Sequence, residues 1–272
     1  MNLVKPLNIV FWGEDAFSNI VLTSLIEAGH RVSLVVTPYY ENFVFKRLEL
    51  TCNKNNIPLL RAKKINSKEV CEAVKRVAPD LCVISHFERL IKQRLLEIPP
   101  MGFINLHPSL LPYYRGMAPQ HWPIINGEKE AGISVHYVEE QADTGNIIVQ
   151  RRFPLLPDMY VFDLQKVWLE NYKTIMVEAI ENILEGKSTI EQRHLEGSYY
   201  GKLTKEQCMI DPNGGVLQAY NLVRGVSQPY FGARHNNLII YRAHIMEGEP
   251  ETDKPILKFN DGLLVADMYK TV

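Results

Sequence analysis

The chain has 272 residues, of which 46% are hydrophobic and 22% charged, a composition typical of globular proteins with a full apolar core. Its formal net charge of −1 argues against a protein that holds nucleic acid through a general excess of lysine and arginine, although a local basic patch stays possible. The four cysteines form no CxxC pair and have no histidine at zinc-ligand spacing, so we expect no disulfides, no metal and a cytoplasmic location. No stretch reaches the roughly 20 apolar residues of a membrane-spanning helix.

The first part of the chain alternates between short apolar runs and amphipathic stretches. Short, continuous apolar runs bounded by Gly or Pro are typical of strands buried on both faces of a parallel sheet. Strands are predicted over residues 7–13, 31–38, 57–62, 80–86 and 102–108. Helices are predicted between them, over residues 17–30, 43–56, 67–79 and 91–99. This order predicts an α/β fold with a doubly wound, mostly parallel sheet and right-handed crossovers.

The second part of the chain changes character near residue 190. Before that point, two strands that look like a pair are predicted over 132–138 and 145–155, followed by one long amphipathic helix over 161–186. After it, one helix lies within 203–229, and strands are predicted over 237–246 and 255–269. Asn260-Asp261-Gly262 predicts a hairpin turn inside the last of these. We therefore expect a main domain over residues 1–190 and a small C-terminal α+β subdomain over residues 191–272 that ends in a β-hairpin.

Polar residues follow several of the predicted strands, and in an open parallel sheet ligands bind beyond the carboxyl ends of the strands. After the first strand, residues 13–18 (GEDAFS) lack the glycines of a dinucleotide or phosphate loop and carry two acids. Asn105 and His107 alternate on the strand over 102–108 and so share one face. A lone histidine there would indicate only a hydrogen-bonded core residue. Together with Asp143 in a later loop, the pair favours a catalytic site.

The segments around these residues resemble a known family. They read SHFERLI at 85–91, NLHPSLLPYYRGMAP at 105–119 and GISVHYVEEQADTGNIIVQ at 132–150, and they resemble the formyltransferases that use N10-formyltetrahydrofolate. The resemblance covers roughly residues 8–190, which makes residues 1–190 the expected catalytic domain. More weakly, residues 210–233 resemble the interdomain region of the sugar-modifying members.

The resemblance implies a catalytic trio of Asn105, His107 and Asp143, in which an amine attacks the formyl carbon and forms a tetrahedral oxyanion. His107 would carry the proton, since the pKa of histidine lies near working pH. Asn105 would donate a hydrogen bond to the oxyanion, and Asp143 would orient His107 or stabilise its protonated ring. No metal is implied.

The resemblance also implies where the folate binds. Main-chain groups of residues 86–88 and the loop at 139–143 would form the pterin walls, with apolar surface at 90–91. The implied folate-binding residues are His86, Phe87, Glu88, Leu90, Ile91, Glu139 and Ala142. Structural roles for Phe87 and Arg89 stay open.

Three branches of the family differ in the acceptor amine. A glycinamide ribonucleotide transformylase should have a phosphate loop where residues 13–18 supply none. A methionyl-tRNA formyltransferase should have a longer chain, a complete C-terminal β-barrel and a basic surface, whereas the charges after residue 190 are close to balanced. The branch that formylates a nucleotide-linked sugar fits best, as residues 120–145, residues 221–233 and the short C-terminal hairpin indicate. A dTDP-linked amino-dideoxy sugar of surface-polysaccharide assembly is the predicted acceptor, with methionyl-tRNA as the alternative.

For a sugar nucleotide, a second set of residues is predicted to contact the acceptor. Arg224 and Asn221 could contact the diphosphate, and Tyr230 or Phe231 could stack on the base. Plain packing explains these two rings equally well. For Arg115, a buried structural role comes first. The predicted substrate-binding residues are Tyr113, Arg115, Gln120, Asn221, Arg224, Tyr230 and Phe231. The C-terminal hairpin is predicted to form a homodimer. A formyltetrahydrofolate hydrolase and a non-catalytic folate-binding protein stay open as alternative functions.

Overall fold

The computed structural model describes residues 5–41, 45–192, 196–248 and 253–272. The chain forms two compact units, and each is described by itself. The first unit consists of Met1–Arg115, Ile133–Arg151 and Trp168–Gly197, and the second unit consists of Gly116–Gly132, Arg152–Val167 and Ser198–Val272. The predicted division at residue 190 lies near the last of these boundaries, but two earlier segments group with the C-terminal part of the chain.

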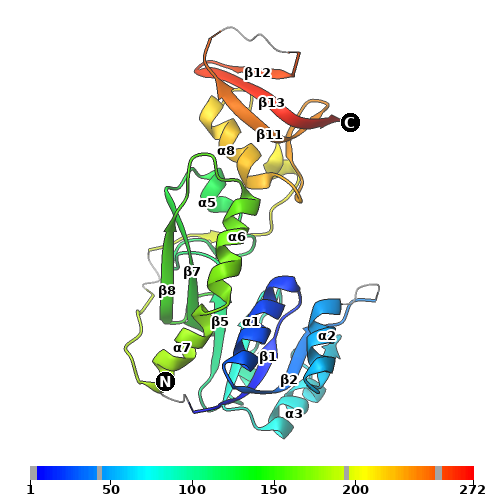
Figure 1. The fold of residues 1–272 in the computed structure, drawn as a ribbon, viewed down its shortest axis with the longest axis vertical. Helices are drawn as coiled ribbons and strands as arrows, with labels where there is room; N and C mark the ends of the chain where they lie inside the picture. Colours follow the sequence, from blue (N-terminus) through cyan, green and yellow to red (C-terminus); the bar gives the residue numbers. More distant parts are fainter. Residues whose placement is uncertain (1–4, 42–44, 193–195, 249–252) are drawn as a thin grey trace. The chain divides into compact units, whose positions relative to one another are not determined.

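The first unit is built on a seven-stranded sheet with the order β3-β2-β1-β4-β5-β7-β8 (Figure 1). The strands from β3 to β5 are parallel, and β7 runs antiparallel to β5. The doubly wound, mostly parallel α/β sheet predicted from the sequence is therefore confirmed, as is the proximity of the two strands after residue 130. The strands are β1 (Asn8–Trp12), β2 (Arg31–Pro38), β3 (Leu59–Ala62), β4 (Leu81–Ser85), β5 (Phe103–His107), β7 (Glu130–Tyr137) and β8 (Ile147–Pro154).

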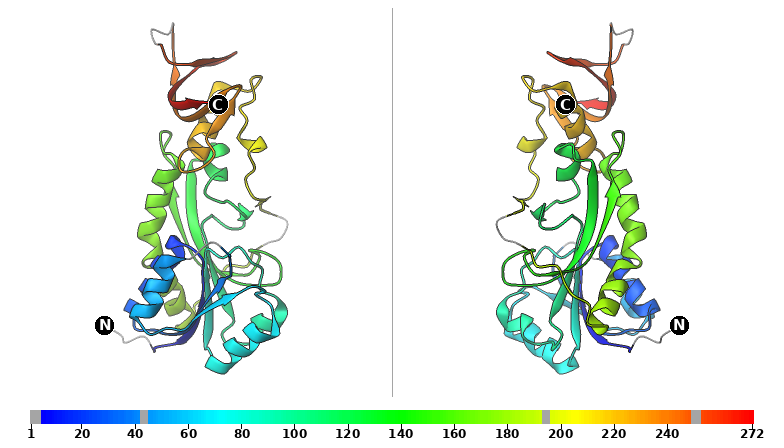
Figure 2. Two further views of the ribbon diagram at one scale, coloured as in Figure 1. Left: turned by 90° about the vertical axis from the view of Figure 1, so that its right-hand side faces the viewer. Right: turned by 90° about the vertical axis from the view of Figure 1, so that its left-hand side faces the viewer.

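Helices cover both faces of the parallel strands, which is why most residues of these strands are apolar. Val10 and Trp12 of β1 belong to a buried cluster with residues of α3 (Lys68–Val77) and α4 (Gln93–Leu96). The alternate residues Ile9 and Phe11 are also fully buried and point to the opposite face. Helices α1 (Ala16–Glu27) and α2 (Lys46–Lys54) lie on that side of the sheet (Figure 2). The predicted helices are thus confirmed with shorter bounds; residues 43 and 44 of one of them lie outside the described residues.

The long helix predicted over 161–186 is wrong in one respect, because two helices occupy that stretch. Helix α6 (Val161–Tyr172) ends before Lys173, and α7 (Ile175–Leu184) begins after Thr174, whose φ of −130° is not helical. Arg151 donates hydrogen bonds to Thr174 Oγ1 (2.7 Å) and Asn171 Oδ1 (3.3 Å) at the break. The apolar spacing of three and four continues across the break, so periodicity alone predicted a continuous helix.

The second unit contains α8 (Val216–Val226) packed on a four-stranded sheet with the order β10-β11-β13-β12. Phe259 pairs with Gly262, so the chain turns at the predicted Asn260-Asp261 position and the terminal hairpin is confirmed. The strands are β10 (Ala233–His235), β11 (Leu238–Met246), β12 (Ile256–Phe259) and β13 (Gly262–Thr271). Among the described residues, the remaining short elements are β6 (Arg115–Gly116), α5 (Trp122–Ile125), β9 (Tyr199–Tyr200) and the 3-10 turn η1 (Glu206–Cys208).

Contacts between α5 and α8 explain why residues 116–132 group with the C-terminal part of the chain. A Cβ atom at Gly225 would lie 2.6 Å from Ile125 Cγ1, so glycine permits the close approach of the two helices. His121 Nδ1 donates a hydrogen bond to the Gly225 carbonyl oxygen at 2.7 Å, and its ring meets that of Tyr230 edge-on with centroids 4.4 Å apart. These pairings join segments far apart in sequence.

The buried His121 predicts an acid-sensitive second unit. Burial lowers the pKa of this imidazole to about 4. As the pH falls below about 6.5, the unfolded chain takes up a proton that the folded chain does not, so stability is lost on acidification. Between pH 7 and pH 5 this one group should cost about 2 kcal/mol of unfolding free energy. Urea unfolding should show that the free energy of unfolding of His121→Gln falls less between pH 7 and pH 5 than that of the wild type. Equal losses in the two proteins would contradict the role of His121 in this acid sensitivity.

The four cysteines are all described, all buried and all free thiols, which confirms the prediction that Cys82 is a small core residue. Among the described ranges of the chain, no helix is long and apolar enough to cross a membrane.

Candidate active site

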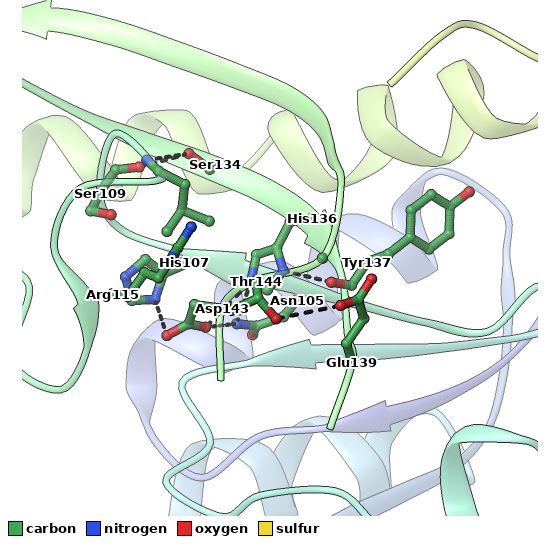
Figure 3. A network of polar contacts seen from close by, with 12 residues as sticks. Asn105, His107, Ser109, Arg115, Ser134, His136, Tyr137, Glu139, Asp143 and Thr144 are labelled. Carbon is green, nitrogen blue, oxygen red and sulfur yellow. Dashed lines mark hydrogen bonds and ion pairs between the residues drawn. The ribbon is translucent and has the colours of Figure 1, made fainter. Parts of the chain in front are cut away.

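The candidate site forms at the carboxyl end of β5, where the antiparallel strand β7 adds to its polar residues. Asn105 and His107 lie two apart on β5 and share a face. The register pairs Asn105 directly with His136 of β7. The loop after β7 then returns Asp143 to the same place, so that the side chains gather around its carboxylate (Figure 3).

The structure brings the three predicted catalytic residues together. Asp143 Oδ2 lies 3.6 Å from His107 Nδ1, and Asp143 Oδ1 lies 3.5 Å from Asn105 Nδ2. Asp143 has a φ of 57°, in the left-handed region that aspartate tolerates better than most residues. Its loop is thus held in an uncommon conformation that points the carboxylate at the end of β5.

His107 is 4% exposed, and both of its ring nitrogens have partners. Nε2 lies 2.8 Å from the Tyr114 carbonyl oxygen, which can only accept, so Nε2 carries a hydrogen and donates it. Burial lowers the pKa of His107 below its usual range, and the charge of Asp143 and the Tyr114 hydrogen bond oppose this shift. The neutral ring therefore has its free electron pair on Nδ1, facing Asp143.

His136 completes the cluster, and the sequence reading did not single it out. It is 1% exposed, and its Nε2 lies 3.2 Å from Asn105 Nδ2 and 3.4 Å from Asp143 Oδ1. A signal was present in the sequence, because His136 alternates with Ser134 on a predicted strand. Placing it beside Asn105 required the antiparallel register of β5 and β7, which the alternation alone does not give.

Gln192 braces the Asp143 loop and was also missed. Its Nε2 donates to the carbonyl oxygens of Asp143 (3.0 Å) and Gly145 (2.7 Å), and its Oε1 accepts from Arg115 Nη2 (3.1 Å) and Nε (3.3 Å). Arg115 is 8% exposed. The arginine reaches the site through Gln192, which favours the structural role that the sequence reading placed first.

The loop after β4 contains the predicted folate-binding residues 86–88 and is held by acids of the first βα turn. Glu14 accepts hydrogen bonds from the Glu88 main-chain N–H and, at 3.0 Å, from the Tyr40 hydroxyl. Burial raises the pKa of Glu14, and these hydrogen bonds oppose the shift. Arg89 donates to the Tyr40 hydroxyl at 2.9 Å. The Glu88 main-chain N–H is thus already hydrogen-bonded to Glu14. The carboxylate of Glu14 in the GEDAFS turn accepts hydrogen bonds from other residues of the protein.

His86 occupies a strained position in the same loop, with a φ of 49°. Its Nδ1 lies 3.1 Å from Asp15 Oδ2, its Nε2 lies 2.9 Å from the Tyr172 hydroxyl, and its ring stacks on Phe17. Burial raises the pKa of Asp15, but the interactions with His86 lower it overall. His86 is therefore locked in place by side chains of the first unit.

The other predicted folate residues have mixed surroundings. Phe87 packs edge-on against Trp12 of the core, which favours its structural reading. Leu90 is 65% exposed, whereas Ile91 is buried in the same core cluster. Glu139 accepts a hydrogen bond from Thr144 Oγ1 at 3.4 Å. Ala142 is half-buried in the Asp143 loop.

A cavity of about 430 Å³ adjoins the loop after β4. Its lining includes the basic residues Lys63, Lys64, Arg89 and Lys92, together with Glu88. Lys63 Nζ lies over the ring of Tyr39, 5.0 Å from its centroid. This excess of positive charge favours an anionic group in the cavity.

The predicted acceptor contacts divide between the two units. Tyr113 (52% exposed) and Arg115 belong to the first unit, and the other five belong to the second. Arg224 is 4% exposed and donates to Asn221 Oδ1 (2.6 Å) and to the Met159 carbonyl oxygen (2.8 Å), which favours a structural role for this pair. Tyr230 accepts a hydrogen bond from Gln165, Gln120 contacts the His121 ring, and Phe231 is 38% exposed.

Within the described ranges, no group of three or more His, Cys, Asp or Glu side chains is arranged to hold a metal ion.

The fold and the cluster define an α/β enzyme in which histidine, asparagine and aspartate side chains meet at the carboxyl end of β5. Residues 8–180 match the family model described as "Formyl transferase". The chain belongs to the formyl transferase family, and its reaction is formyl transfer.

Relatives and solved structures differ in the substrates that their names state. The methionyl-tRNA formyltransferase of Geobacter sulfurreducens is 32% identical over 95% of this chain and 85% of its own length. That of Geobacter metallireducens is 36% identical over 84% of this chain and 75% of its own length. The sugar 3N-formyl transferase WlaRD, solved with dTDP and 5-N-formyl-THF, has a TM-score of 0.71 at 20% identity, over 97% of this chain and 98% of its own. The Helicobacter canadensis N-formyltransferase, solved with folinic acid and dTDP-3-aminofucose, has a TM-score of 0.71 at 19% identity, over 96% and 98%. At these identities the structures establish a shared fold.

Proposed function

We propose that the protein transfers the formyl group of N10-formyltetrahydrofolate to the amino group of a nucleotide-linked, dTDP-type amino-dideoxy sugar. The observation that carries the chemistry is the convergence of Asn105 and His107 on Asp143 at the end of β5. A formyl-folate donor follows from the family, and the acceptor is the part that the proposal adds.

The site supplies each group that acyl transfer to an amine needs. The amine attacks the formyl carbon, and the oxygen of that group becomes an oxyanion. Asn105 Nδ2 donates to this oxyanion, a contact of about 3 kcal/mol when it is preorganised. His107 and Asp143 take the proton that the amine loses and return one to the departing N10.

Two features support a sugar nucleotide as the acceptor. The chain matches WlaRD and the Helicobacter canadensis enzyme from end to end, with 98% of each covered, although this likeness is one of fold. The charges after residue 190 are close to balanced, whereas a tRNA-binding surface needs an excess of lysine and arginine.

A homodimer through the C-terminal hairpin is part of the proposal, and sedimentation as a monomer at micromolar concentration would remove it.

Methionyl-tRNA is the second candidate acceptor, because the 32% identical relative that covers 95% of this chain is a methionyl-tRNA formyltransferase. A panel assay separates the two. The protein is incubated with N10-formyltetrahydrofolate and, in turn, with dTDP-4-amino-4,6-dideoxyglucose, its 3-amino isomer, a UDP-amino sugar and methionyl-tRNA. Mass spectrometry reports which acceptor gains one formyl group. A gain on methionyl-tRNA alone overturns the sugar proposal.

The same assay tests the remaining alternatives. A formyltetrahydrofolate hydrolase would release formate with no amine present, and a non-catalytic folate-binding protein would release none and formylate nothing. Either result would contradict transferase activity itself, whatever the acceptor.

The basic cavity predicts how the donor is held. The glutamate tail of the folate is anionic, and the cavity beside the loop after β4 contains Lys63 and Lys92. The double variant Lys63→Ala/Lys92→Ala should raise the KM for a polyglutamylated donor about tenfold and change kcat less than about twofold, since exposed charges contribute about 1 kcal/mol or less each. Lys173→Ala, which removes an exposed lysine paired with Glu170, is the matched control. An unchanged KM in the double variant would exclude this role of the cavity.

A further inference from the structure

The two acids of the first βα turn both hold the loop that follows β4. Residues 13–18 lack the glycines of a phosphate loop and carry Glu14 and Asp15 instead. Asp15 Oδ2 lies 3.1 Å from Nδ1 of His86, at the start of the loop. Glu14 accepts a hydrogen bond from the Glu88 main-chain N–H, two residues further on. Adjacent acids thus fix two points of the loop whose main-chain groups are expected to contact the folate.

Glu14 accepts hydrogen bonds through both oxygens of its carboxylate. Its side chain lies inside the first unit, with 8% of the residue exposed. Oε1 accepts from the Glu88 N–H, and Oε2 accepts from the Tyr40 hydroxyl at 3.0 Å. Burial disfavours the charged form of this carboxyl and raises the pKa of Glu14. Because a buried carboxylate is costly unless it is hydrogen-bonded, Glu14 and its two partners hold one another in place.

The hydrogen-bond network continues from Glu14 to the wall of the basic cavity. Tyr40 accepts a hydrogen bond from Arg89 Nη2 at 2.9 Å, and the Arg89 guanidinium lies over the Tyr40 ring, 5.6 Å from its centroid. Arg89 Nη1 also donates to the Glu88 carbonyl oxygen at 3.2 Å. Glu88 and Arg89 both line the cavity. Glu14 is therefore connected to the cavity wall through the main chain of Glu88 and through the side chain of Tyr40.

Asn66 holds the other end of the same loop, but through more exposed contacts. Its Nδ2 donates to the Leu90 carbonyl oxygen at 2.9 Å, and its Oδ1 accepts from the Lys92 N–H at 2.8 Å. Both hydrogen bonds are exposed, whereas the one between Glu14 and Glu88 is partly buried. Water replaces a lost partner at an exposed group, but a buried N–H that loses its acceptor carries a larger cost. Loss of the Glu14 carboxylate is therefore expected to displace the loop.

We propose that Glu14 is a positioning residue for the formyl-folate donor, because it fixes residues 86–88 in the conformation that binds the donor. The Glu88 N–H then anchors the loop to Glu14 and is not a contact to the pterin. This role rests on the proposed function, which places the donor beside the loop after β4. It gives a use to the acids that stand where a phosphate loop would have glycines.

Calorimetric titration of the full chain with 5-formyltetrahydrofolate, the folate present in the WlaRD structure, tests this role without an acceptor. Glu14→Ala removes the acceptor of the Glu88 N–H, and we expect the Kd to rise about tenfold. Glu14→Gln supplies an oxygen for that N–H and an N–H for the Tyr40 oxygen, so its Kd should stay within about threefold of the wild type. Equal weakening in the two variants would overturn the proposal, because the hydrogen bonds would then not explain the effect.

Hydrogen exchange and a control variant separate positioning of the loop from general damage to the fold. Peptides that cover residues 85–92 should exchange faster in Glu14→Ala than in the wild type or Glu14→Gln, while the strands of the sheet keep their protection. Glu49→Ala is the matched control, because it removes a carboxylate of the first unit that pairs with Arg61 at 2.9 Å. Unchanged exchange in Glu14→Ala, or equal weakening of donor binding in Glu49→Ala, would overturn the proposal.

Steady-state kinetics distinguish failure of this role from failure of the proposed function. Glu14→Ala should raise the KM of the donor about tenfold and change kcat and the KM of the acceptor less than about twofold. A fall in kcat with an unchanged donor KM would overturn the proposal. If no acceptor in the panel is formylated, the proposed function fails, while donor binding and hydrogen exchange still decide the role of Glu14. If an acceptor is formylated and Glu14→Ala binds the donor normally, the role of Glu14 alone fails.

Discussion

Replacing Asp143 with asparagine is expected to lower kcat by at least about 100-fold while the protein stays folded. The substitution keeps the size of the side chain and removes its charge. Burial disfavours the charged form of His107, and the negative charge of Asp143 opposes that effect. Without the charge of Asp143, the protonated imidazole of His107 loses its stabilising partner at the step where His107 must carry the proton.

The measurement is steady-state formyl transfer, with circular dichroism to verify the fold. His107→Ala should cause a loss of similar size, since the two groups act as a unit. Glu72→Gln is a matched control, because it neutralises an exposed carboxylate of α3 that pairs with Lys68. If Asp143→Asn kept more than about a tenth of the wild-type kcat, the role assigned to this carboxylate would be wrong.

The parallel part of the sheet could be predicted because its sequence signals are local. Strand β2 has the predicted bounds, Arg31–Pro38, since an apolar run ending at proline is unambiguous over eight residues. The break between α6 and α7 could not be predicted in this way. It depends on Arg151, which is distant in the sequence and binds side chains at the break. The grouping of residues 116–132 with α8 likewise depends on contacts such as that of His121 with Gly225.

The residues of the site also differ in whether a local sequence signal or a contact between distant segments identifies them. Asn105 and His107 could be found because they alternate on one strand, and Asp143 because it lies in a recognisable loop. His136 and Gln192 are as buried as His107. The alternation of His136 with Ser134 does not place His136 beside Asn105, and no local pattern marks Gln192 as part of the site. His136 enters through the register of an antiparallel pair, and Gln192 through hydrogen bonds to main-chain oxygens. His136 and Gln192 can therefore be identified as neighbours of the site only from the folded structure.

Gly145→Ala is expected to cause a second large loss, of at least about 100-fold in kcat, although this residue carries no functional group. A Cβ atom at Gly145 would lie 2.0 Å from the Tyr137 carbonyl oxygen and 2.7 Å from its carbonyl carbon, so main chain would have to move. The same turn contains Asp143, and Tyr137 also accepts from His136. A displacement of about 1 Å at a catalytic group is enough for an effect of this size.

The predicted loss has a cause that can be separated from general damage to the fold. Gly201→Ala is the control, because a Cβ atom there has no neighbour within 4 Å and its backbone is outside the left-handed region. Gly145→Ala should also lower the free energy of unfolding by about 1–3 kcal/mol, the usual range for overpacking. A normal kcat in a destabilised Gly145→Ala would mean that the Asp143 loop tolerates displacement. A low kcat together with unchanged donor binding would show that the position of the carboxylate, held by a glycine two residues away, limits the reaction.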